Sequence, residues 1–131
     1  MTRLYEYINM ETEKGVGILN IGMSYQQLVT LTTENLEPGK YLIGYSWEGD
    51  FHEQKNRPFY TQLTGTFAGE EFSDSIGDND TGFKNRFYAF PKDWAGGVIT
   101  LGVQGKKDSL FSAQMDITFI DVFVLRVGDQ D

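Results

Sequence analysis

The sequence contains no cysteine, one histidine and only three prolines among 131 residues. The absence of cysteine excludes disulfides, thiolate nucleophiles and zinc sites built on cysteine ligands. No apolar run approaches the roughly 18 residues of a membrane-spanning helix. The first residues, MTRLYEYINMETEKG, are too polar for a secretion signal. We therefore expect the chain to be made and folded in a cytosol.

Positive charge is also scarce, with 11 Lys and Arg against 19 Asp and Glu and a net charge of −8. Nucleic-acid binding depends on basic side chains that neutralise phosphates, and binding to anionic membranes depends on basic segments. No basic patch stands out in the sequence. We therefore expect neither nucleic acid nor a membrane as partner.

Aromatic residues are abundant, at 15% of the chain, and 15 glycines accompany them. Each buried aromatic side chain removes roughly 150–250 Å² from water, so a chain of this length can form a substantial core. No internal repeat, linker or low-complexity segment divides the sequence. We expect one domain over residues 1–131.

Alternation of period two is clearest in residues 40–48. One face of this predicted strand carries Tyr41, Ile43, Tyr45 and Trp47. Pro38 and Gly39 precede it as the central pair of a predicted type II turn, which would join it to an antiparallel neighbour over residues 27–34.

The closing segment, residues 111–127, predicts a long strand that bends or bulges near Asp121. Its later half is apolar on both faces, as expected of a strand that is covered on both sides. Further strands are predicted at residues 3–9, 15–22, 58–67, 83–90 and 97–104. Helices are expected at most as single turns, at 23–27 or 91–95. About seven to nine strands predict an all-β fold, a single antiparallel β-sandwich of the jelly-roll type.

The segment WEGDFHE gathers the residue types of a candidate site: Trp47, Glu48, Asp50, Phe51 and His52. Paired carboxylates such as Glu48 and Asp50 suit glycoside hydrolysis, but Gly49 favours the end of a strand at this point. The sequence HEQKN lacks the second histidine of a helical zinc site, and no GxSxG nucleophile motif is present. We interpret the segment as a loop that contacts solvent or a partner protein, and we expect no catalytic residue and no enzyme activity.

The acidic segment SDSIGDNDTG, residues 73–82, carries hard oxygen donors of the kind that calcium binds. The glycine and the closing glutamate of an EF-hand loop are missing from their positions. A solvated acidic turn therefore remains the main interpretation, and no metal or cofactor is predicted. Partner contact is expected at Glu70, Glu71, Asp78 and Asp80.

Five further aromatic residues stand at strand spacing: Tyr60, Phe67, Phe72, Tyr88 and Trp94. Such residues belong to a core, or they form a stacking platform for a sugar. The sequence leaves both interpretations open.

The hairpin LEPGKYLIGYSWEGDF and the closing strand ITFIDVFVLRVG resemble jelly-roll modules of two groups. The first group comprises accessory proteins of tailed-bacteriophage virions, namely capsid decoration or cement proteins, head fibres and tail-fibre tips. The second comprises the carbohydrate-binding modules of glycoside hydrolases. Neither group has a residue signature that is present in this sequence, so the resemblance assigns no role to a particular residue.

The first resemblance implies a capsid decoration protein that is made in the host cytoplasm, belongs to the virion, and binds the major capsid protein or another virion protein. A homotrimer is one candidate assembly. The acidic balance, the absence of a secretion signal and the excess of aromatic residues favour this hypothesis. The alternative is a carbohydrate-binding or receptor-binding module that uses exposed aromatics such as Trp47 or Trp94.

Overall fold

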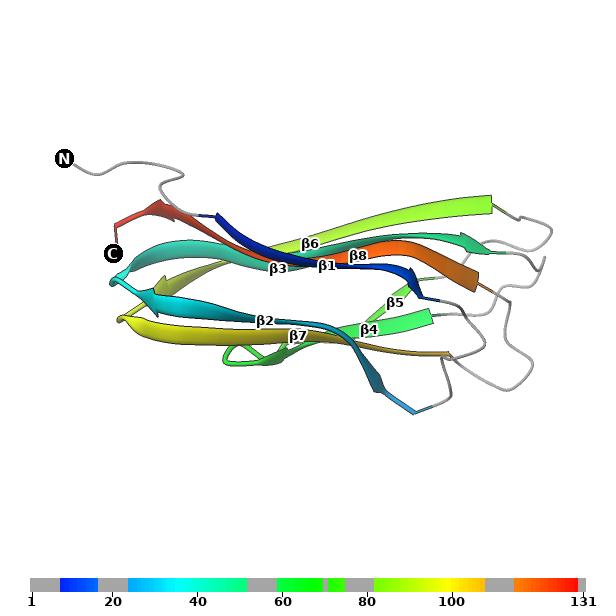
Figure 1. The fold of residues 1–131 in the computed structure, drawn as a ribbon, viewed down its shortest axis with the longest axis horizontal. Helices are drawn as coiled ribbons and strands as arrows, with labels where there is room; N and C mark the ends of the chain where they lie inside the picture. The colour runs from blue at the N-terminus through cyan, green and yellow to red at the C-terminus, as the bar shows by residue number, and fades with distance from the viewer. Residues whose placement is uncertain are drawn as a thin grey trace.

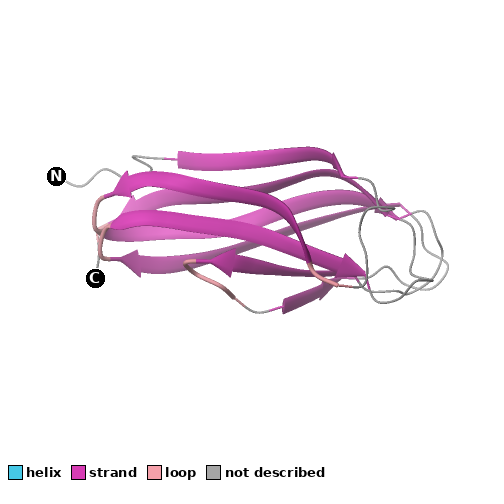
Figure 2. Cartoon of the chain, turned by 60° about the horizontal axis from the view of Figure 1, so that its bottom comes forward, coloured by secondary structure: helices cyan, strands magenta, loops and turns pink. Residues whose placement is uncertain are grey.

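The computed structural model describes residues 8–16, 24–51, 59–69, 71–74, 82–107 and 115–129. These residues form eight β-strands in two four-stranded antiparallel sheets that lie face to face (Figure 1). All regular structure in the described part is strand (Figure 2). No helix long and apolar enough to cross a membrane occurs among the described residues.

The first sheet has the strand order β1 (Ile8–Val16), β8 (Met115–Gly128), β3 (Gly39–Phe51) and β6 (Gly82–Trp94). The second has the order β2 (Gln26–Leu36), β7 (Gly97–Lys107), β4 (Phe59–Gly65) and β5 (Glu71–Asp74). Apart from the step from β4 to β5, successive strands alternate between the sheets. This order is that of a jelly roll, so the predicted fold class is confirmed.

The core lies between the sheets and is built on the alternation that the sequence shows. On β3 the buried side chains are Tyr41, Ile43, Tyr45 and Trp47, as predicted. The facing strands contribute Leu31, Phe59, Leu63, Ile99, Leu101 and Val103. Between the two layers, the hydroxyls of Tyr45 and Thr61 share a buried hydrogen bond of 2.8 Å.

Strands β2 and β3 follow one another in the chain but are not neighbours in a sheet, so the predicted hairpin is wrong. Strand β2 pairs with β7, whereas β3 lies between β6 and β8. The predicted type II turn is wrong as well, because the described glycines with positive φ are Gly65, Gly96 and Gly97. Residues 37 and 38 instead carry the chain from one sheet to the other.

Gly39 is required for a different reason, which is a close approach to Arg126. A Cβ atom on Gly39 would lie 2.7 Å from the Arg126 Nε. The guanidinium of Arg126 donates a hydrogen bond of 3.1 Å to the Pro38 carbonyl and lies 3.9 Å from a carboxylate oxygen of Glu37. Arg126 therefore fixes the crossover between the sheets.

Strand β8 has an extra residue against β3 at Thr118 and another at Val127, on either side of the predicted position at Asp121. The register against β3 passes from Phe119 to Ile117 and leaves Thr118 as the extra residue. Ile117 and Ile120 are both fully buried although they differ in parity. The extra residue at Thr118 reverses which parity faces the core, which is why Ile120, Val122 and Val124 are apolar. The other parity stays apolar at Phe123 and Leu125 on the outer side of the sheet.

The other predicted strands agree in part with the structure. Segments 58–67, 83–90 and 97–104 correspond to β4, β6 and β7, and the latter two are longer than predicted. The single helical turns are wrong where the structure describes them, because residues 26–27 begin β2 and residues 91–94 end β6. Strand β5 was not predicted.

The N-terminal strand falls between two of the predicted segments. Strand β1 spans Ile8–Val16, whereas strands were expected at 3–9 and 15–22. Most of these two segments lies outside the described residues.

Candidate functional site

Trp47, a residue predicted for partner or sugar contact, is part of the core. It is 1% exposed, and its ring meets the ring of Phe59 edge-on at 5.4 Å. Its indole nitrogen is buried without a hydrogen-bond partner in the described part of the chain. Trp47 therefore cannot contact a partner or stack on a sugar, and that prediction is wrong.

Among the remaining residues predicted for partner contact, the two whose side chains are described lie on different sheets. Glu48 is half-buried on the outer side of β3, whereas Glu71 is exposed on the outer side of β5 in the other sheet. Only the backbone of Asp50 and Phe51 is described, as part of β3, so the predicted end of the strand at Gly49 and the loop predicted from there are wrong up to residue 51. The other predicted residues, His52, Glu70, Asp78 and Asp80, lie outside the described residues.

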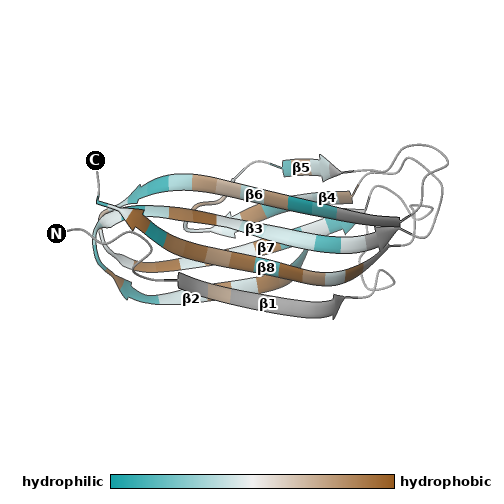
Figure 3. Cartoon of the chain, turned by 90° about the horizontal axis from the view of Figure 1, so that it is seen from above, coloured by the Kyte–Doolittle hydropathy of each residue, from teal (hydrophilic) through white to brown (hydrophobic). Residues whose placement is uncertain are grey.

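Two surfaces stand out instead, one on the outer side of each sheet. The outer side of the first sheet, which Figure 3 views, carries a group of apolar side chains beside polar ones such as Ser46, Glu48 and Asp121. We call this apolar group the apolar face; it comprises Met10, Leu42, Phe87, Ala89, Pro91, Phe123 and Leu125. Phe87 is 66% exposed and Met10 is 51% exposed, which is unusual for side chains of this size.

A stacked pair of phenylalanines belongs to the apolar face, with Phe87 on the edge strand β6 and Phe123 on β8. The rings of Phe87 and Phe123 lie 5.5 Å apart with an interplanar angle of 15°. Strands β6 and β8 are separated by β3, so their backbones lie about 9.5 Å apart. The two rings therefore lean toward each other across β3. Gly44 pairs with Phe123 and Ala89 on the strand between them, and a Cβ atom there would lie 1.9 Å from the Tyr88 backbone oxygen of β6.

The outer side of the second sheet is polar, and we call it the polar face. Its centre is one row of side chains in register across all four strands: Gln27, Gln104, Gln62 and Glu71. The Gln62 carboxamide donates a hydrogen bond of 2.9 Å to the Gln104 carboxamide oxygen. The Gln27 carboxamide donates one of 3.0 Å to the backbone carbonyl of Val29.

A charged cluster borders this row at one end of the polar face. The Lys106 ammonium lies 4.7 Å from the ring centroid of Tyr25 and 5.2 Å from that of Tyr60. It also lies 3.8 Å from a carboxylate oxygen of Glu71, which accepts a hydrogen bond from the Tyr25 hydroxyl. Burial, together with this bond and the negative charge of Glu71, raises the pKa of Tyr25.

On the other side of the row lies Gly102, which has no side chain to cover the backbone of β7. A Cβ atom there would lie 2.0 Å from the Gln27 Nε2 and 2.7 Å from the Thr64 Oγ1. The Gln27 carboxamide therefore rests on the bare backbone of β7. Of the residues on the polar face, only Tyr60 and Glu71 are singled out by the sequence. In YTQLTG and GVQGK every second residue is polar or glycine and alternates with a core residue, and this pattern is the sequence signal for the face.

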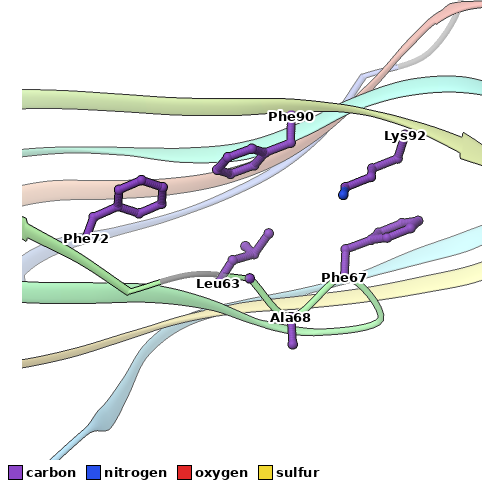
Figure 4. A pocket seen from close by; sticks show the side chains of 7 residues that line it. Leu63, Phe67, Ala68, Phe72, Phe90 and Lys92 are labelled. Atoms are coloured by element: carbon purple, nitrogen blue, oxygen red, sulfur yellow. The ribbon is translucent and has the colours of Figure 1, made fainter.

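A cavity of about 260 Å³ opens where β6 faces the turn between β4 and β5 (Figure 4). It is lined by Leu63, Phe67, Ala68, Gly69, Phe72, Phe90 and Lys92. Lys92 is the one titratable side chain of this lining, so the lining supplies no acid–base pair. No group of three side chains suited to hold a metal ion occurs among the described residues.

The aromatic residues around this cavity belong to the core and not to a sugar platform. Phe72 stacks on Tyr88 at 4.1 Å, and Phe67 meets Trp94 edge-on at 5.4 Å. All four are partly buried against the core cluster. The Trp94 indole also donates a hydrogen bond of 3.2 Å to a backbone carbonyl. Of the five aromatics that the sequence left open, only Tyr60 lies on an outer face.

No known protein family matches this sequence, and no curated protein matches it either. Among solved structures, dimeric latent PorU from Porphyromonas gingivalis is similar with a TM-score of 0.53 and 12% identity, over 92% of this chain and 13% of that one. A chain of infectious bursal disease virus, Gx strain, gives a TM-score of 0.48 and 10% identity over 97% of this chain and 32% of that one. The C-terminal CBM6 of the laminarinase LamC from Zobellia galactanivorans gives a TM-score of 0.38 and 14% identity, over 96% of this chain and 98% of that one.

The comparison with PorU supports the fold and leaves the function open. Viral and carbohydrate-binding proteins are both represented among the similar structures, at low identity. The chain spans 13% of the PorU chain and 32% of the viral one. The likeness to PorU shows a shared β-sandwich fold and nothing about activity.

Proposed function

We propose that this protein is a non-enzymatic structural component of a tailed-phage virion, a capsid decoration or cement protein. The observation that carries the proposal is the stacked, two-thirds exposed Phe87 of the apolar face. Contiguous exposed apolar surface on a soluble protein marks a site of interaction. We therefore expect the contact on the outer side of the first sheet, and not in the loops that the sequence favoured.

The free energy available at this face is sufficient to matter. Two-thirds of a phenylalanine side chain corresponds to roughly 100–165 Å² of surface. Burying that area at ~25 cal/mol/Å² contributes about 3 kcal/mol, or about two orders of magnitude in Kd. Met10, which is half exposed and paired with the buried Phe123, extends the same surface.

Charge indicates which kind of partner covers the face. The chain carries a net charge of −8, so two copies repel one another, whereas a surface rimmed by basic side chains attracts it. We therefore expect an apolar surface with a basic rim on a shell protein, such as the major capsid protein. The homotrimer expected from the sequence stays a prediction, which the molar mass in solution tests.

The mechanism is mass action. A protein that binds across neighbouring subunits binds the assembled shell and not its separated parts. Such binding stabilises the assembly in proportion to the logarithm of its free concentration over Kd. No catalytic step is needed, and no reacting group is assigned.

The proposal is tested by co-sedimentation with capsids of the virus that carries this gene, using wild type, Phe87→Ser and Val98→Ser. Val98 is a matched control because it is 49% exposed on the outer side of the second sheet. We expect wild type and Val98→Ser to pellet with the capsids and Phe87→Ser to bind roughly a hundredfold more weakly. Wild type that stays in the supernatant, with capsids no more heat-stable in its presence, would contradict the proposal.

A further inference from the structure

The polar face lies on the opposite side of the sandwich from the apolar face (Figures 1 and 2). A molecule docked through Phe87 would therefore leave the polar face open to solvent. The two faces can act at the same time and can be disabled separately.

The row Gln27–Gln104–Gln62–Glu71 is continuous across the sheet. Neighbouring strands lie about 4.8 Å apart, so four side chains in register span about 14 Å. This length suits a short chain of sugar rings lying across the strands. In the neighbouring row, two residues further along β4 and β7, Thr30 and Thr64 flank Gly102 and add hydroxyl groups to the same surface.

The side chains of the row are already held in place by protein contacts. Gln62 is bonded to Gln104, and Gln27 is bonded to a backbone carbonyl and rests over Gly102. Ordering a long side chain on binding costs about 0.5–1.5 kcal/mol, and side chains that are fixed beforehand lose less. The side chains of the row are therefore preorganised for a ligand, whereas a sheet surface that only contacts solvent does not need ordered side chains.

The chemistry of the row selects the class of ligand. A carboxamide has two N–H donors and one carbonyl acceptor, so three of them match groups that donate and accept at once. Sugar hydroxyls are such groups. Among the contacts of the described residues, the bonds of Gln62 and Gln27 use two of the six N–H donors of the row.

Charge argues for a neutral ligand. The cation of the polar face, Lys106, lies between two tyrosine rings and 3.8 Å from the Glu71 carboxylate, which offsets its charge. With the net charge of −8, the surface does not favour a polyanion. The phenol of Tyr60 adds an amphipathic aromatic group beside the row.

We propose that the outer face of the β2–β7–β4–β5 sheet binds a neutral oligosaccharide across its strands, on the carboxamides of Gln27, Gln104 and Gln62. On a virion component, such a site would attach the particle to neutral sugars on a cell surface or to a neutral polysaccharide. The proposal uses neither tryptophan of the chain.

The first test is an NMR titration of the wild-type protein with neutral hexasaccharides, namely cellohexaose, laminarihexaose, xylohexaose and mannohexaose, and with alginate hexasaccharide as an anionic probe. We expect at least one neutral probe to shift the side-chain amide signals of the three glutamines. The absence of any shift at these amides with all neutral probes, or binding of the anionic probe alone, would overturn the proposal. This titration does not depend on any variant being folded.

The second test compares affinities of variants for the neutral probe that binds. Gln62→Leu keeps the approximate size of the side chain and removes its polar groups, and we expect it to weaken binding about tenfold or more. Thr32→Ala is the control, since Thr32 is exposed on the same side of β2 but away from the row. Equal affinities of wild type and a folded Gln62→Leu would overturn the proposal. Sugar binding that persists in Phe87→Ser would show that this site is independent of capsid docking.

Discussion

The hydrogen bond between Tyr45 and Thr61 provides a test of how the two sheets are joined. Tyr45 is on β3 in the first sheet and Thr61 is on β4 in the second, and both residues are fully buried. Their hydroxyl oxygens lie 2.8 Å apart. The perturbations are Tyr45→Phe, Thr61→Val and the double variant, each of which removes a hydroxyl and keeps most of the packing.

The magnitude follows from burial. Each single substitution leaves one hydroxyl buried without this partner, at a cost of about 1–3 kcal/mol. The double variant leaves no hydroxyl behind, so it costs less than the sum of the two, with a coupling energy of about 1–2 kcal/mol. For a chain of this size, each 1 kcal/mol corresponds to roughly 3–5 °C in Tm.

The assay is urea denaturation of the four proteins, with the free energy of unfolding taken from the midpoint and slope of each transition. Unchanged slopes would show that the variants unfold to the same extent. Single effects that add to the double effect within about 0.3–0.5 kcal/mol would refute the reasoning, because residues that do not interact behave in that way.

Three further predictions concern the core, the strand pairing and the polar face. Trp47→Ala is expected to lower the free energy of unfolding by about 3–5 kcal/mol in urea denaturation, and a loss below 1 kcal/mol would show that the ring is not buried. Gly44→Ala would place a Cβ atom 1.9 Å from a carbonyl oxygen of β6 and is expected to destabilise the fold by about 3 kcal/mol or more. Gly128→Ala is the control, because its Cβ atom meets nothing within 4 Å and the substitution should be neutral. Equal melting temperatures of the two variants would contradict this prediction. Because burial and then the bond to Glu71 raise the pKa of Tyr25, its neutral phenol stabilises the fold fully below the ordinary tyrosine pKa of about 10, and this stabilisation is lost as the pH rises further. Denaturation at increasing alkaline pH should therefore show a steeper loss for wild type than for Tyr25→Phe, and equal losses would exclude this role.

The sequence predicts which side chains of β3 face the core, but it does not predict which strands pair with β3. Alternation between Tyr41 and Trp47 is a local pattern, and burial of one parity follows from it. Pairing is decided by residues far along the chain, since β3 lies between β6 and β8. The predicted pairing of residues 27–34 with 40–48 assumed that consecutive strands are neighbours, which a jelly roll violates by sending them to opposite sheets.

The same limit applies to the candidate surfaces. The polar parity of β4 is visible in the sequence at Tyr60, Gln62 and Thr64. That Gln62 stands in register with Gln104 on one side and Glu71 on the other depends on the order of three strands. The apolar face depends on topology in the same way, since Phe87 meets Phe123 only because β6 and β8 lie on either side of one strand.

The central claim is that the apolar face, and not the polar face, is covered when the protein is bound to a virion shell. Hydroxyl-radical footprinting of the free and the capsid-bound protein tests this directly, because methionine, phenylalanine and tyrosine side chains all react when they are exposed. We expect Met10 and Phe87 to lose most of their labelling on the capsid, whereas Tyr25 and Tyr60 keep theirs. Unchanged labelling of Met10 and Phe87, or protection of the two tyrosines in their place, would contradict the account.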